Sequence, residues 1–118
     1  MSKVLIYHNP RWGNSRESVQ ILNDLSVDYE IIDYLNMPPT ADELQSLANK
    51  MGLKARDFIR TKEAVFKELN LQPHLDDDTF MFQKMSEYPK LIERPIVVKG
   101  DRAVLGRPPE RIREFLKS

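Results

Sequence analysis

The sequence predicts an α/β fold in which a βαβ unit and a ββα unit flank a block of helices. Three observations support this prediction. Short apolar runs of strand type occur at 3–7, 29–34, 95–99 and 102–105. Apolar residues recur at helical spacing in the segments between them, and Pro or Gly residues mark the joints. No repeat, low-complexity tract or Gly/Ser linker divides the 118 residues, so we expect one domain over 1–118.

The amino-terminal part predicts the βαβ unit. The apolar run 3–7 forms the first strand, a helical repeat at about 15–25 follows with Asn14 as its N-cap, and 29–34 forms the second strand. The turn between the first strand and the helix leaves backbone N–H groups at a helix start. This loop is therefore suited to face an anion.

The middle of the chain predicts helices. Thr40 and Glu43 form a capping box at a helix start, and Gly52 ends that helix in the left-handed conformation. We interpret the three aspartates at 76–78 as capping and first-turn charge of a later helix rather than as a cation site. The expected helical segments after Gly52 are about 55–60, 63–69 and 78–88, the last ended by Pro89.

The carboxy-terminal part predicts a hairpin followed by a helix. Gly100 and Asp101 form a tight turn signal between the strands at 95–99 and 102–105. Pro109 suits the first position of a final helix over about 110–116.

Composition excludes several classes of function. The formal net charge is zero, which argues against binding to nucleic acid or to an anionic membrane surface. There are no cysteines, so disulfides, thiolate metal sites and thiol catalysis are excluded, and two histidines far apart make a metal site improbable. No apolar stretch is long enough to cross a bilayer and no signal-peptide pattern is present, so we expect a cytoplasmic protein.

The stretch 7–16, Tyr-His-Asn-Pro-Arg-Trp-Gly-Asn-Ser-Arg, resembles the active-site loop of the glutaredoxin-coupled arsenate reductase (ArsC-like) family. That loop reads roughly His-Asn-Pro-x-Cys-x-x-Ser-Arg, so Trp12 stands where the family carries its nucleophilic cysteine. The resemblance covers essentially the whole chain and points to the YfgD-like branch. It is most specific at Arg94-Pro95-Ile96-Val97-Val98 and at Gly106-Arg107-Pro108-Pro109-Glu110.

The resemblance implies a thioredoxin-like fold, with a mixed four-stranded sheet and a helical insertion between its two halves. In such folds the proline that begins the third strand is usually cis, and Pro95 holds that position. A cis bond there would turn the region of Arg94 toward the site.

The resemblance also implies an oxyanion site. Three arginines of the family bind the substrate oxyanion, and they carry over by motif onto Arg60, Arg94 and Arg107. Guanidinium groups present paired donors that match two oxygens of a tetrahedral anion and stay charged at any working pH. The alternative is three separate surface arginines in ion pairs worth about 0–1 kcal/mol each.

The loop residues His8, Gly13, Asn14 and Ser15 are the other oxyanion-binding candidates. His8 either contacts the anion or fixes the loop backbone by hydrogen bonds. Ser15 either contacts the anion or helps to complete the helix end. A serine nucleophile would need an adjacent base, and no third orienting group is evident.

The family activity is arsenate reduction, with glutathione and glutaredoxin as reductants and no bound cofactor. An indole has no lone pair available for attack, so the chain as written is predicted to be inactive as a thiol reductase. Trp12 either fills the anion pocket or exposes its ring beside the arginines. The expected partners are a small oxyanion (arsenate, phosphate or sulfate) and glutaredoxin or another protein. A non-enzymatic protein-interaction or regulatory module on the same scaffold is the alternative.

Overall fold

The computed structural model describes residues 3–8, 13–106 and 108–117, so Trp12 and Arg107 lie outside the described residues. By its contacts the chain forms two compact units. The first unit joins the two ends of the chain, Met1–Tyr34 and Arg94–Ser118, and the second is the intervening segment Leu35–Glu93. Each unit is described by itself.

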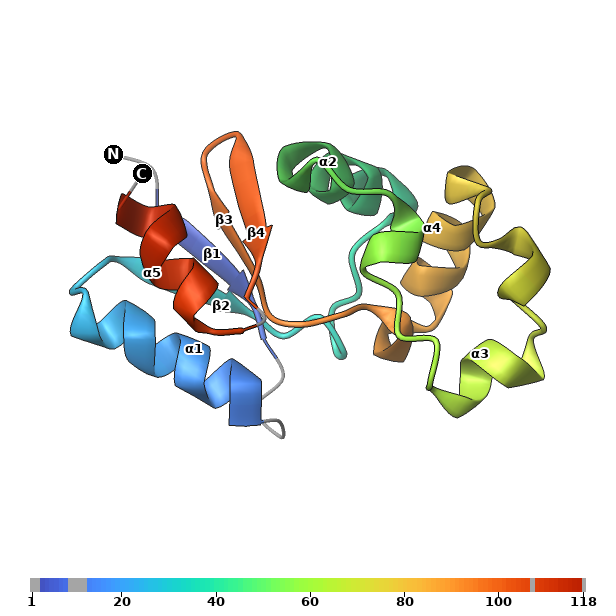
Figure 1. The fold of residues 1–118 in the computed structure, drawn as a ribbon, viewed down its shortest axis with the longest axis horizontal. Helices are drawn as coiled ribbons and strands as arrows, with labels where there is room; N and C mark the ends of the chain where they lie inside the picture. Colours follow the sequence, from blue (N-terminus) through green and yellow to red (C-terminus); the bar gives the residue numbers. More distant parts are fainter. Residues whose placement is uncertain (1–2, 9–12, 107, 118) are drawn as a thin grey trace. The chain divides into compact units, whose positions relative to one another are not determined.

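The first unit contains a mixed four-stranded sheet in the order β2-β1-β3-β4 (Figure 1). Strand β1 (Val4–Tyr7) pairs in parallel with β2 (Tyr29–Ile32) and antiparallel with β3 (Ile96–Lys99). Strand β4 (Arg102–Leu105) completes the sheet as the antiparallel partner of β3. The sheet and the helical segment inserted between its halves confirm the predicted thioredoxin-like topology.

Helices α1 (Gly13–Asp24) and α5 (Glu110–Lys117) pack against one face of this sheet (Figure 1). Side chains from alternate strand positions meet the apolar faces of the two helices, as the period-two pattern of a strand requires. The buried core of this layer consists of Val4, Ile6, Ile21, Leu22, Val97 and Ile112.

Two predicted boundaries in the first unit are wrong. Helix α1 begins at Gly13, so Asn14 lies within the helix instead of capping it. A cap preference is worth only about 1 kcal/mol, so packing of the helix can override it. Strand β2 ends at Ile32 rather than at Tyr34 because its ladder partner β1 ends at Tyr7.

The second unit is helical. Thr40 caps α2 (Ala41–Met51) by accepting a hydrogen bond from the Glu43 backbone N–H at 3.1 Å, and Gly52 follows the helix with φ of 68°, which confirms both predicted ends. Its remaining elements form the predicted helical block, with short 3₁₀ turns between the helices, except that the helical turn predicted over 55–60 is present only as a 3₁₀ turn over 55–57. The elements are α2 (Ala41–Met51), η1 (Ala55–Asp57), α3 (Ala64–Glu68), η2 (Gln72–His74), α4 (Asp78–Glu87) and η3 (Pro89–Leu91).

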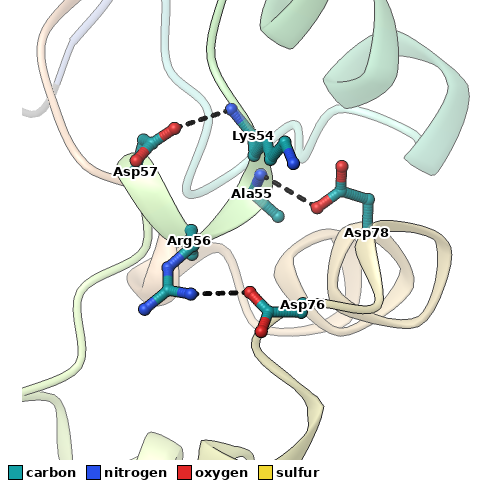
Figure 2. A network of polar contacts seen from close by, with 6 residues as sticks. All are labelled: Lys54, Ala55, Arg56, Asp57, Asp76 and Asp78. Atoms are coloured by element: carbon teal, nitrogen blue, oxygen red, sulfur yellow. Dashed lines mark hydrogen bonds and ion pairs between the residues drawn. The ribbon is translucent and has the colours of Figure 1, made fainter.

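A polar network joins η1 to the start of α4 (Figure 2). Asp77 caps α4, and the neighbouring Asp78 accepts a hydrogen bond from the Ala55 backbone N–H at 3.2 Å. Asp76 forms an ion pair with Arg56 at 2.6 Å. The cap at Asp77 and the place of Asp78 in the first turn confirm the predicted capping and first-turn charge, whereas Asp76 forms an ion pair instead. Among the described residues, no group of three His, Cys, Asp or Glu side chains could hold a metal ion.

Within the described part of the chain, no helix combines the length and the apolar character needed to cross a membrane.

Candidate functional site

His8 lies directly after β1, at the end of the strand that leads into the predicted anion loop. Its backbone N–H donates to the Ile32 carbonyl at 3.1 Å, and its side chain is buried. Burial lowers the pKa of His8 below its usual 6.5, and the negative charge of Asp33 opposes this shift. The imidazole is therefore held mainly neutral near pH 7, so it can offer an anion an N–H group but little positive charge.

The Nδ1 atom of His8 is buried and makes no hydrogen bond to the described residues. Residues 9–12 of the loop that follows His8 lie outside the described residues. The choice between the two predicted roles of His8 stays a prediction.

Gly13, Asn14 and Ser15 form the first turn of α1. The first backbone N–H groups of a helix have no partner within the helix and carry the positive end of its dipole. The backbone here therefore has the polarity that an anion requires. Trp12, immediately before this turn, lies outside the described residues.

Arg60 lies in a short extended segment of the second unit. Ile59 forms an antiparallel bridge with Ile92, and both side chains are buried. The Arg60 backbone N–H donates to the Leu91 carbonyl at 2.7 Å, and the Glu93 N–H donates to the Phe58 carbonyl at 2.8 Å. The helical turn predicted over 55–60 is therefore present only in η1, because the last residues of that range pair with another segment.

Arg60 has two acidic neighbours, of which the pairing brings one, Glu93, from a distant segment. Its Nε lies 3.1 Å from Oε1 of Glu63, and its Nη1 lies 3.9 Å from Oε1 of Glu93. The three side chains are 19%, 25% and 19% exposed, so the cluster is partly shielded from solvent. Sequence reasoning missed both acids: Glu63 is three residues from Arg60 and could have been found, whereas Glu93 is 33 residues away and carries no local signal.

Arg94 belongs to the first unit and is 7% exposed. Arginine is rarely buried to this extent unless its guanidinium is paired. The peptide bond between Arg94 and Pro95 is cis, which confirms the prediction.

The structure brings two of the predicted motifs together. The Gly106 backbone N–H donates to the Pro95 carbonyl at 2.8 Å, which joins the segment that precedes Arg107 in the sequence to the segment that follows Arg94. Arg107 itself lies outside the described residues. The convergence of Arg60, Arg94 and Arg107 on one anion stays a prediction.

The chain is similar to known proteins over most of its length. The model of the ArsC family matches residues 7–115. An arsenate reductase of Haemophilus influenzae is 44% identical over 115 residues, covering 96% of this chain and 98% of that protein. Protein YfgD of Escherichia coli is 42% identical over 115 residues, covering 97% of each chain. The solved structure of an arsenate reductase from Vibrio cholerae superposes with a TM-score of 0.88 at 44% identity, covering 96% of this chain and 97% of that one.

Proposed function

Because the chain belongs to the ArsC family, we propose that it binds a tetrahedral oxyanion through Arg60, Arg94 and Arg107 without reducing it by a thiol mechanism. The observation that carries this proposal is the presence of all three arginine motifs in a chain that contains no cysteine. The ligand class is arsenate, phosphate or sulfate.

The arginines supply most of the binding energy. Each guanidinium offers planar N–H donors and a permanent positive charge to the oxygens of the anion. The backbone N–H groups of Gly13, Asn14 and Ser15 add the positive end of the α1 dipole. A mainly neutral His8 contributes a hydrogen bond rather than charge.

The loss of reduction follows from the chemistry of residue 12. In the family reaction a cysteine thiolate attacks arsenate and expels water, which forms a thiol–arsenate adduct. Glutathione then attacks the adduct, arsenite leaves, and glutaredoxin reduces the resulting mixed disulfide. The indole of Trp12 has no lone pair for the first step, and no other side chain of this sequence supplies sulfur for a thiolate. Glutathione therefore has no thiol–arsenate adduct to attack, and glutaredoxin has no mixed disulfide to reduce.

Calorimetric titration of the protein with arsenate and with phosphate tests the proposal. We expect saturable binding, and we expect Arg94→Lys to weaken it by about 10- to 100-fold, because a charge-assisted hydrogen bond is worth about 1.5–3 kcal/mol. Arg113→Gln is the control: this arginine lies on α5 in an exposed ion pair with Asp24, and its loss should leave the affinity unchanged.

Failure of the folded wild-type protein to bind either anion would refute the oxyanion function. That result would favour the protein-interaction alternative. Thermal unfolding of each variant in the absence of anion separates lost binding from lost folding.

A further inference from the structure

Arg60 lies beside two carboxylates, an unusual arrangement for a residue that binds an anion. We propose that Glu63 and Glu93 make the site selective for tetrahedral oxyanions that carry a proton, such as hydrogen phosphate and hydrogen arsenate, and against sulfate. This inference rests on the proposed oxyanion function and assigns the two acids as specificity-determining residues within it.

The two acids are placed by separate structural elements. Glu63 precedes α3 as its N-cap residue, and its backbone N–H donates to the Arg60 carbonyl at 3.3 Å. Glu93 is held by its hydrogen bond to the Phe58 carbonyl beside the bridge of Ile59 and Ile92. Both positions are therefore fixed by backbone hydrogen bonds rather than only by the ion pairs with Arg60.

An anion bound to Arg60 would meet these carboxylates at close range. A guanidinium carries five N–H donors in one plane, and acceptors on neighbouring donors lie next to each other. Oε1 of Glu63 is 3.1 Å from Nε and Oε1 of Glu93 is 3.9 Å from Nη1, and both contacts are ion pairs rather than hydrogen bonds. An anion that binds the same guanidinium therefore brings its oxygens close to these carboxylates. Partial burial of all three side chains reduces the screening of that contact by water.

The proton of the anion then decides whether this contact attracts or repels. Near neutral pH, phosphate and arsenate keep at least one O–H group, whereas sulfate has none. An ionised carboxylate only accepts hydrogen bonds, so it can accept the O–H of hydrogen phosphate in a short charge-assisted bond. When sulfate is bound, the carboxylate oxygen faces a sulfate oxygen that also only accepts hydrogen bonds and also carries negative charge. The resulting repulsion is of the kind that creates specificity.

A purely structural role for the acids predicts a different outcome. If Glu63 and Glu93 only neutralise Arg60, they lower the affinity for every anion by a similar factor, and their removal raises all affinities together. Under our proposal, their removal changes the ratio of the phosphate and sulfate affinities. The ratio is therefore the measurement that distinguishes the two roles.

The experiment compares the affinities of the full chain for inorganic phosphate and for sulfate at neutral pH and constant ionic strength. The variants are Glu63→Gln, Glu93→Gln and the double variant, which remove the negative charge at nearly constant shape. Glu68→Gln is the matched control, because it makes the same charge change at an exposed position of α3, the helix that Glu63 precedes. Phosphate titrations of all variants also report whether each remains folded and competent to bind.

We expect wild-type protein to prefer phosphate over sulfate by at least about tenfold, since sites built to bond a ligand O–H reject analogues that lack it. The double variant should lose most of this preference, chiefly through tighter sulfate binding, and each single variant should lose part of it. The Glu68→Gln protein should keep it. If the double variant did not fold, the two single variants would give the same comparison.

Equal affinity of the wild-type protein for the two anions would overturn this inference and leave the proposed function intact. So would a preference that persists after both acids are replaced. Absence of binding of phosphate, arsenate and sulfate would overturn the proposed function and this inference together.

Discussion

Replacement of Gly106 by alanine should destabilise the protein, because this glycine lies in close contact with two neighbours. A Cβ atom built on Gly106 would lie 2.9 Å from Cδ1 of Ile112 and 3.0 Å from Cγ of Pro95. The Ile112 side chain is fully buried, and Pro95 is a ring that cannot rotate away. Inserting a methyl group into such a packed region typically costs about 1–3 kcal/mol.

The loss of unfolding free energy can be measured by urea unfolding, and the change in thermal midpoint by thermal unfolding. A cost of about 1–3 kcal/mol lowers the thermal midpoint by about 4–12 °C in a domain of this length. The variant Ile112→Val removes Cδ1, the atom nearest to the new methyl group. Alone it should cost about 0.5–1.5 kcal/mol. In the Gly106→Ala background it should cost distinctly less, because it also relieves the overlap.

Gly52→Ala is the control for an effect of glycine on the backbone alone. Gly52 has a φ of 68° and no heavy atom within 4 Å of its ideal Cβ position. Its replacement should cost about 1–2 kcal/mol through backbone strain, with no dependence on Ile112. If the free energies of Gly106→Ala and Ile112→Val were simply additive, the close approach of Gly106 to Ile112 would be refuted.

Two further predictions concern the helical unit and the loop histidine. Asp78→Ala should reduce the free energy of unfolding by about 1–3 kcal/mol, because a part-buried N–H of η1 loses its acceptor. Asp76→Ala should reduce it by less than about 1 kcal/mol, because the ion pair of Asp76 is exposed. Equal losses for the two variants in urea unfolding would contradict this difference between the two contacts. Burial lowers the pKa of His8, so the folded protein binds fewer protons at this residue than the unfolded chain does. The free energy of unfolding should therefore fall as the pH drops through 6.5, and the loss should be complete below the pKa of His8 in the folded protein. The contribution of His8 to the slope of unfolding free energy against pH is at most about 1.4 kcal/mol per pH unit. His8→Gln should flatten this slope. An unchanged slope in that variant would show that other groups cause it.

The sequence predicted best those elements whose signals are local. Thr40, Glu43 and Gly52 mark the ends of α2 by side-chain capping and by a left-handed residue, and both ends are confirmed. The hairpin at Gly100 follows from turn chemistry between two apolar runs. The start of α1 was wrong because Asn14 is a good cap by composition, yet the helix extends past it.

The environment of Arg60 could not be predicted because it depends on contacts between distant segments. The run 55–60 has a helical composition, yet the bridge of Ile59 with Ile92 makes its end extended and brings Glu93 to Arg60. Burial of Arg94 likewise depends on tertiary structure. The functional information in the sequence lies in the arginine motifs and in Trp12, which stands at the position of the family cysteine. Both were recognised by resemblance to the family.

Arsenite production in an assay coupled to glutathione and glutaredoxin, measured for the wild-type protein and for Trp12→Cys, tests the central claim most directly. We expect the wild-type protein to remain at background and Trp12→Cys to produce arsenite, because the variant would supply the thiolate that the proposed oxyanion site lacks. Turnover by the wild-type protein would contradict the claim that thiol chemistry is lost. A folded Trp12→Cys protein with neither a reactive thiol nor turnover would contradict the claim that the rest of the reductase site is retained.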